Sequence, residues 1–263
     1  MFSRPTWRSR TLYQVLATVC VLPFALPLFW IVQISFSGSG PVENYSAVIV
    51  KTPFFQFFLN SVVIAASAVV IVFVCTMLAG YALAKLGLRG RNVIFMIILA
   101  GLMVPAVAMT VPYFLMVRKL DLFNNYLAVI VPLCAGILPM TVLLTRNYLV
   151  GVPNELLEAA KIDGAGTFRT LIRIVIPLSK PIIAVVMVWS FLQAWNNFFL
   201  PLIMMPKSQM QTITQIPTYF TSAYGSDIGK IFAALTLICI PIVILYLAFQ
   251  KYFEQGLTAG AVK

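Results

Sequence analysis

Long apolar runs separated by short polar stretches are the dominant pattern of this chain. Six runs are long enough to cross the roughly 30 Å hydrocarbon core of a bilayer, which takes about 20 helical residues. We expect six membrane-spanning helices, near residues 11–36, 59–84, 92–117, 126–147, 181–205 and 231–253. Proline and glycine inside the runs, such as Gly80 and Pro105, predict kinks and close helix packing. The pattern therefore predicts an all-α, polytopic membrane protein with a single domain over residues 1–263.

The first run has two interpretations. Arg4, Arg8 and Arg10 precede it, as basic residues precede the apolar part of a cleaved signal peptide. That apolar part usually has about 7–15 residues, whereas this run is much longer. We therefore prefer an uncleaved first span.

A polar stretch at residues 148–180 interrupts the apolar pattern between the fourth and fifth runs. Pro153 suits the first position of a helix, and Glu155 and Glu158 suit its first turns. Gly164 suits the end of that helix. A second amphipathic helix is then predicted by apolar residues at helical spacing, namely Phe168, Leu171, Ile172 and Val175. The stretch is thus expected to hold two helices, joined at a glycine, on a membrane surface.

Composition makes lipid the expected solvent of the chain. Of its 263 residues, 61% are hydrophobic and 10% are charged, whereas a soluble domain has about 25% charged residues. The net charge of +11 would also suit a nucleic-acid ligand, but the basic residues lie at the ends of apolar runs. We therefore expect membrane lipid, and no nucleic acid, as a partner.

The distribution of basic residues predicts the orientation in the membrane. If the N-terminus is cytoplasmic, 13 of the 18 Lys and Arg residues fall on the cytoplasmic side and five on the other. Cytoplasmic segments of membrane proteins carry such an excess. We therefore expect both termini, and the polar stretch 148–180, in the cytoplasm.

Residues that usually carry catalysis or bind metal are scarce. The chain has no histidine, and its four cysteines lie inside apolar runs without metal-ligand spacing. All seven carboxylates fall in loops or at span ends, so a proton-coupled carrier is disfavoured and the solute should not be strongly charged. No nucleotide-binding P-loop is present either. We expect no enzyme, no catalytic residue, no metal site and no cofactor on this chain, with energy supplied by a partner.

Neutral polar residues within the spans are the candidate solute contacts. They are Asn60, Gln193, Trp195, Asn196 and Asn197. Amides that bond hydroxyl groups, next to an aromatic ring that covers the C–H face of a sugar, suit a carbohydrate. The alternative is that these residues are hydrogen-bonding contacts between helices, or that Trp195 is an interfacial anchor.

The polar stretch also carries a family resemblance. The motifs Glu158-Ala159-Ala160, Asp163-Gly164-Ala165 and Ile174-x-Ile176-Pro177, followed by Pro181, resemble the EAA loop of ABC-importer membrane subunits. The resemblance implies a cytoplasmic coupling helix that docks into a groove on an ATPase subunit. The implied coupling residues are Leu156, Leu157, Glu158, Ala159, Ala160, Asp163 and Gly164. A simple amphipathic linker between two spans is the alternative.

Three further segments resemble carbohydrate-importer permeases of the maltose-transporter type. They are Asn60-Ser61 followed by Leu78-Ala79-Gly80-Tyr81-Ala82-Leu83-Ala84, the run W-N-N-F-F-L-P-L from Trp195, and the tail from Gly256 to Lys263. Asn197 stands where that family usually has an acid, so any role of that acid is in doubt here. The resemblance implies the type I importer permease fold in the inner membrane of a prokaryote. It also implies a second permease of similar fold, two ATPase subunits that bind ATP and Mg, and an extracytoplasmic solute-binding protein.

Together these observations predict a permease subunit that forms half of a translocation path for a sugar or oligosaccharide. The first alternative is a permease for another solute, such as a polyol or a glycerol-phosphate compound. The second is a secondary carrier, and the third is a membrane enzyme, for which no catalytic constellation is visible.

Overall fold

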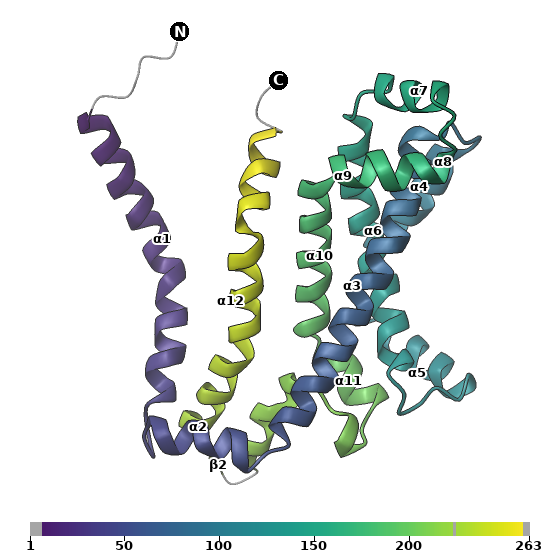
Figure 1. The fold of residues 1–263 in the computed structure, drawn as a ribbon. Coiled ribbons are helices and arrows are strands. Elements are labelled where there is room, and N and C mark those ends of the chain that lie inside the picture. Colours follow the sequence, from purple (N-terminus) through teal and green to yellow (C-terminus); the bar gives the residue numbers. More distant parts are fainter. Residues whose placement is uncertain (1–6, 223–224, 260–263) are drawn as a thin grey trace. The chain divides into compact units, whose positions relative to one another are not determined.

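The computed structural model describes residues 7–222 and 225–259, and these are almost entirely helical (Figure 1). The longer helices are α1 (Trp7–Ser35), α2 (Pro41–Val50), α3 (Phe54–Lys85), α4 (Arg91–Ala100), α5 (Thr110–Lys119), α6 (Leu127–Val150), α7 (Glu155–Ile162), α10 (Lys180–Trp195) and α12 (Ile228–Ala259). The shorter elements are η1 (Gly101–Met103), α8 (Thr167–Thr170), η2 (Leu171–Val175), α9 (Ile176–Leu178), α11 (Phe199–Met204), η3 (Ser208–Met210), η4 (Ile213–Phe220), β1 (Thr221–Ser222) and β2 (Gly225–Ser226). The all-α prediction is confirmed, since the two antiparallel strands have two residues each.

Four of the expected spans are continuous helices. Among the described residues, α1, α3, α6 and α12 each contain a stretch long and apolar enough to cross a membrane. A fifth span forms if the helical segments Thr167–Leu178 and Lys180–Trp195, which meet at 85°, count as one bent unit. These helices correspond to the runs predicted near 11–36, 59–84, 126–147, 231–253 and 181–205.

The run near 92–117 is not one helix, and here the prediction was wrong. The chain leaves α4 through η1, turns at residues 104–109 and restarts as α5. Pro105 offers no backbone N–H and keeps the residue before it out of the helical region, so Val104 is extended at φ −85° and ψ 117°. The run near 181–205 is also interrupted, because α10 ends at Trp195 and α11 begins at Phe199. Residues 37–58, between the first two predicted spans, hold α2 and the first turn of α3.

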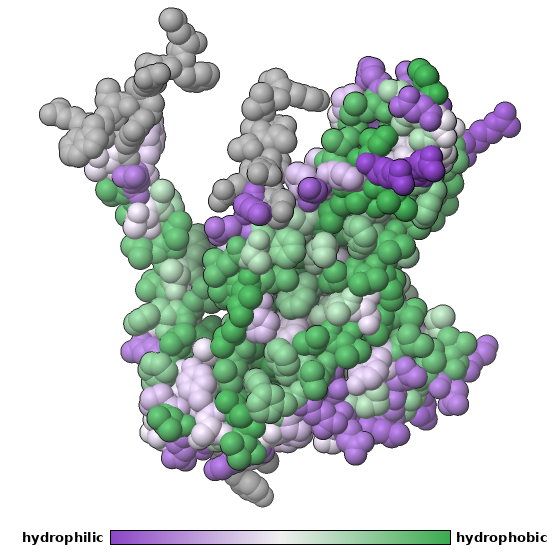
Figure 2. Space-filling model, in the orientation of Figure 1, coloured by the Kyte–Doolittle hydropathy of each residue, from purple (hydrophilic) through white to green (hydrophobic). Residues whose placement is uncertain are grey.

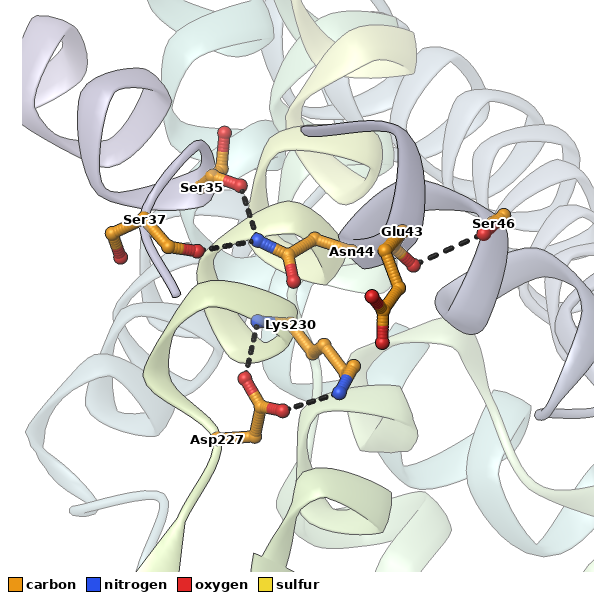
Figure 3. Close-up of polar contacts among 7 residues, drawn as sticks. All are labelled: Ser35, Ser37, Glu43, Asn44, Ser46, Asp227 and Lys230. Carbon is orange, nitrogen blue, oxygen red and sulfur yellow. Dashed lines mark hydrogen bonds and ion pairs between the residues drawn. The ribbon is translucent and has the colours of Figure 1, made fainter. Parts of the chain in front are cut away.

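Two compact units make up the chain, and the first consists of Met1–Phe54 and Ile216–Ile240. Its centre is the buried Asn44 of α2, whose amide donates hydrogen bonds to the carbonyls of Ser35, at 2.9 Å, and Ser37, at 2.8 Å (Figure 3). A Cβ atom on Gly229 would lie 2.5 Å from the same Ser37 carbonyl oxygen. Only glycine therefore lets the first turn of α12 pack against this corner between α1 and α2.

The second unit consists of Phe55–Gln215 and Pro241–Lys263. In its centre α3 and α6 meet through small side chains. The Thr76 and Thr141 hydroxyls lie 2.8 Å apart in a buried hydrogen bond, and a Cβ atom on Gly80 would be 2.7 Å from Thr145 Cγ2. Small residues and hydroxyl pairs are how helices approach closely within lipid. The expectation of one domain over 1–263 stays a prediction.

Candidate functional site

The polar stretch 148–180, which we call the coupling loop, is attached to the end of α3. Lys85 Nζ donates hydrogen bonds to the Val152 carbonyl, at 2.6 Å, and to Asn154 Oδ1, at 2.7 Å. These two acceptors flank Pro153, which lies outside α7 instead of at its first position, because the helix begins at Glu155. One cation thus fixes the chain immediately before the helix.

The end of α7 has the hydrogen bonds of a Schellman motif. Gly164 has a left-handed φ of +77°, the Ala165 N–H donates to the Ala160 carbonyl at 2.8 Å, and the Gly164 N–H donates to the Lys161 carbonyl at 3.0 Å. This pair of bonds satisfies carbonyls that the last helical turn leaves free. The predicted stop of the helix at Gly164 is therefore confirmed.

The inner face of the coupling loop packs on α3 and α6. Leu157 is only 8% exposed and belongs to a buried apolar cluster with Met77, Tyr81, Leu149, Leu171 and Val175. Ala160 is buried as well. The Leu157 side chain thus fills the core of this chain, which leaves Leu156 as the exposed leucine of α7. Leu157 and Ala160 hold α7 in place.

The outer face of the loop is exposed and partly apolar. Ile162 is 86% exposed and Phe168 is 66% exposed, and Leu156 and Ile172 are exposed beside them. The predicted coupling residues Glu158, Ala159, Asp163 and Gly164 are exposed too. Figure 2 shows polar and apolar residues side by side at this end of the second unit. Ile162 and Phe168 were not among the predicted coupling residues, although Phe168 was placed on the apolar face of the second helix. Ile162 follows Leu156 and Ala159 at intervals of three residues.

The last part of the coupling loop is a helix that meets α10 at a bend. Residues Thr167–Leu178, which we call the surface helix, consist of α8, the π-helical η2 and α9, and meet α10 at 85°. Pro177 has no N–H for the carbonyl of Arg173, and its ring would clash with that carbonyl in a regular α-helix. The wider π turn accommodates this conflict. The surface helix is also tied to α6, since the Tyr148 hydroxyl donates to the Leu178 carbonyl at 3.1 Å.

Three of the predicted solute contacts are structural residues. Trp195 is 1% exposed, stacks on Phe191 with ring centroids 5.3 Å apart, and meets Phe58 edge-on at 5.7 Å. It is therefore covered by these rings in the described chain, and Trp195 positions its neighbours. Asn197 Oδ1 accepts a hydrogen bond from the Leu200 N–H at 3.1 Å, which caps α11 after the interruption.

Asn60 anchors the segment after α11. Its Nδ2 donates to the carbonyls of Gln209, at 2.9 Å, and Gln211, at 2.8 Å, and its Oδ1 accepts from the Tyr126 hydroxyl at 2.7 Å. The neighbouring Ser61 hydroxyl accepts from the Ile213 N–H at 2.9 Å. The amide hydrogens of Asn60 are thus both used within the chain.

Gln193 and Asn196 do lie together on an open face of α10. Both are exposed, and no hydrogen bond joins either side chain to another described residue. Trp189 is 38% exposed and completes an i, i+4, i+7 row with them. We call these three residues the α10 stripe. Trp189 was not among the predicted solute contacts, although its helical spacing from Gln193 is visible in the sequence.

The α10 stripe lies at membrane depth. The 16 residues of α10 rise by about 24 Å, which is less than the roughly 30 Å of the hydrocarbon core. The interruption at residues 196–198 is therefore inside the membrane. Non-helical backbone and free amides at that depth are tolerated only inside protein or beside a water-filled cavity. The described residues contain no group of three or more side chains that would hold a metal ion.

Comparisons with known proteins agree with this architecture. Residues 76–259 match the family model described as "Binding-protein-dependent transport system inner membrane component". The arabinooligosaccharides transport system permease protein AraQ of Bacillus subtilis (strain 168) is 35% identical over 210 residues, covering 80% of this chain and 74% of that protein. The trehalose/maltose transport system permease protein MalG of Thermococcus litoralis is 32% identical over 264 residues, covering 95% of this chain and 94% of that protein.

The fold is also found in a solved transporter. The chain is similar to one in the crystal structure of a bacterial ABC transporter involved in the import of the acidic polysaccharide alginate, with a TM-score of 0.77 and 23% identity. The match covers 95% of this chain and 100% of that chain. The chain therefore belongs to the binding-protein-dependent transport system inner membrane components, which are permease subunits of ABC importers and not a family of enzymes.

Proposed function

We propose that this permease forms half of a translocation path for a neutral sugar or oligosaccharide, with a second permease of similar fold as the other half. The names of its relatives support a carbohydrate, since they include transporters of arabinooligosaccharides and of trehalose and maltose. The only charged residue of α10 is Lys180, at its first position. A solute that passes the α10 stripe thus meets neutral groups of this chain, which suits a neutral solute.

The observation that carries the proposal is the α10 stripe beside an interrupted span. Transporters bind solutes near the middle of the membrane at discontinuous helices, where polar groups are free. The amides of Gln193 and Asn196 match hydroxyl groups as donors and acceptors, and Trp189 offers an exposed aromatic face. The chain around this site is positioned by the contacts of Asn60, Trp195 and Asn197.

The coupling loop supports the second half of the proposal, which is ATP-driven transport. Its exposed face, with Leu156, Ala159, Ile162 and Phe168, would dock on one of two ATPase subunits that bind ATP and Mg. Its inner face is packed on α3 and α6 through the Leu157 cluster. A displacement of α7 would thus be transmitted to both helices. An extracytoplasmic solute-binding protein would deliver the solute, and both termini would lie in the cytoplasm of a prokaryote.

The test is solute uptake by variants of the α10 stripe. Loss of one polar partner in a buried site typically costs about 1–3 kcal/mol, which is on the order of tenfold or more in affinity. Gln193→Ala and Asn196→Ala are therefore expected to raise the half-saturating sugar concentration about tenfold, with unchanged binding of the ATPase. Asn147→Ala is the matched control, since this exposed amide lies at the far end of α6.

The result that would overturn the solute site is uptake by both variants indistinguishable from wild type across several sugars at limiting concentration. Trp189→Phe should retain uptake better than Trp189→Ala, because the aromatic face remains. Equal loss in the two Trp189 variants would argue against stacking on this residue.

A further inference from the structure

A crevice in the second unit has no role in the proposed transport function. It consists of two adjoining cavities, of about 450 Å³ and about 180 Å³, that share Met187 of α10 and Phe249 of α12. Lys180 and Pro177 line the larger cavity, at the corner between the surface helix and α10. Phe191 lines the smaller one. The crevice therefore runs along α10 from its first residue towards its middle and beyond.

The size of the crevice matches a single acyl chain. From Lys180 to Phe191 the helix rises by about 16 Å, which is roughly half of the hydrocarbon core and thus the depth of one leaflet. An unbranched acyl chain that reaches the middle of the bilayer therefore matches the length of the crevice.

The lining of the crevice is apolar except at its mouth. The smaller cavity is lined only by aliphatic, methionine and phenylalanine side chains, among them Val62, Met187 and Leu245. Lys180 is the only charged residue lining the larger cavity. Arg173 is also exposed and lies four residues before the cavity-lining Pro177 in the surface helix. The surface helix and α10 contain no carboxylate, so Lys180 is the charge that these two helices bring to the lining, while α12 carries Lys251 and Glu254 beyond Phe249.

The crevice and the α10 stripe lie on opposite faces of the same helix. Successive residues of an α-helix are about 100° apart, so Met187 and Phe191 point roughly 180° away from Trp189, Gln193 and Asn196. The amide-bearing face is the one that suits a hydrated solute. The face with the crevice is the one that suits lipid.

We propose that the crevice binds an anionic phospholipid from the leaflet on the side of the coupling loop. One acyl chain lies along Met187 and Phe249, and the phosphate is bound at the mouth by Lys180 and Arg173. Clusters of basic residues at the rim of apolar spaces between helices recognise anionic headgroups. The site places a lipid against the bend between the surface helix and α10.

The experiment measures lipid bound to the full chain, purified with the subunits that accompany it, by native mass spectrometry. The probes are phosphatidylglycerol and phosphatidylcholine with identical acyl chains. We expect phosphatidylglycerol to bind more tightly, and the double variant Lys180→Gln/Arg173→Gln to weaken it by about thirtyfold, at roughly fivefold per cation. The matched control is Arg89→Gln/Lys161→Gln, which removes two exposed cations outside the crevice.

A second variant tests the acyl chain separately. Met187→Trp fills the space shared by the two cavities and should reduce the binding of both lipids. Equal binding of the two lipids to wild type would overturn the proposal, as would an equal loss in the crevice and control double variants. Because the readout is bound lipid, its outcome is independent of sugar uptake.

Discussion

Gly164 at the end of α7 allows a prediction that separates backbone conformation from side-chain contact. Its φ of +77° is left-handed, and a Cβ atom added there would meet nothing within 4 Å. Gly164→Ala therefore introduces no clash, but it places an L-residue in a conformation that costs about 1–2 kcal/mol. Such a cost corresponds to a factor of about 5–30 in the local opening equilibrium. Gly166→Ala is the matched control, since Gly166 has φ −67° and also has nothing within 4 Å.

The measurement is amide hydrogen exchange in the peptide that covers the end of α7, where the Ala165 N–H is bonded to the Ala160 carbonyl. We expect exchange about 5–30 times faster in Gly164→Ala, and unchanged in Gly166→Ala. Gly164→Asn should fall between wild type and Gly164→Ala, because asparagine tolerates the left-handed region. Association with the ATPase should decline in the same order. If Gly164→Ala exchanges as slowly as the control, the left-handed glycine does not hold this helix end and the reasoning fails.

Three other predictions concern the remaining parts of the chain. A cysteine at the exposed Ser46 should react with an impermeant thiol reagent in intact cells, and one at the exposed Thr167 only after lysis; the reverse pattern would invert the topology. Asn60→Ala should expose residues 209–213 to protease, and normal resistance would refute its anchoring role. A hydrogen bond from Lys230 lowers the pKa of Asp227 below its ordinary 3.8 (Figure 3). Their contact should therefore stabilise the folded state above pH 3.8. This stabilisation should be lost as the pH falls through the lowered pKa. Asp227→Asn should abolish this acid-side change in thermal unfolding, and an unaltered pH profile would contradict the assignment.

Apolar length predicted the long helices well, because α3, α6 and α12 each need only a continuous apolar sequence and lipid around it. The same criterion failed at residues 104–109, where mean hydropathy stays high while the backbone breaks. Pro105 was the visible sign, but its effect depends on Val104 becoming extended, which hydropathy does not measure. Tertiary packing at α6 then accommodates the break, since a Cβ atom on Gly101 would lie 3.1 Å from Pro139.

The candidate sites divide in a similar way. The position and end of α7 follow from local chemistry, because Gly164 and the bonds around it are neighbours in sequence. Local chemistry does not determine whether Leu157 and Trp195 are buried. Residues far away in the chain, such as Tyr81 and Phe58, cover these two side chains. A motif thus locates a functional segment but leaves open which of its side chains face a partner. The open face of α10 could be identified only when the exposure of each side chain was known in addition to the helical spacing.

The π turn in the surface helix affects the direction in which the exposed face of the coupling loop points. A wide turn holds one residue more than a regular α-helical turn would need, and each residue of an α-helix corresponds to about 100° of rotation. The extra residue therefore rotates Phe168 about the helix axis by about this angle, relative to its position in a regular α-helix that ends at Pro177. Deleting Ile172 would restore a regular α-helix and rotate the exposed face by about 100°. The number of residues in this turn therefore contributes to the direction in which the exposed face points, and point substitutions do not alter that number.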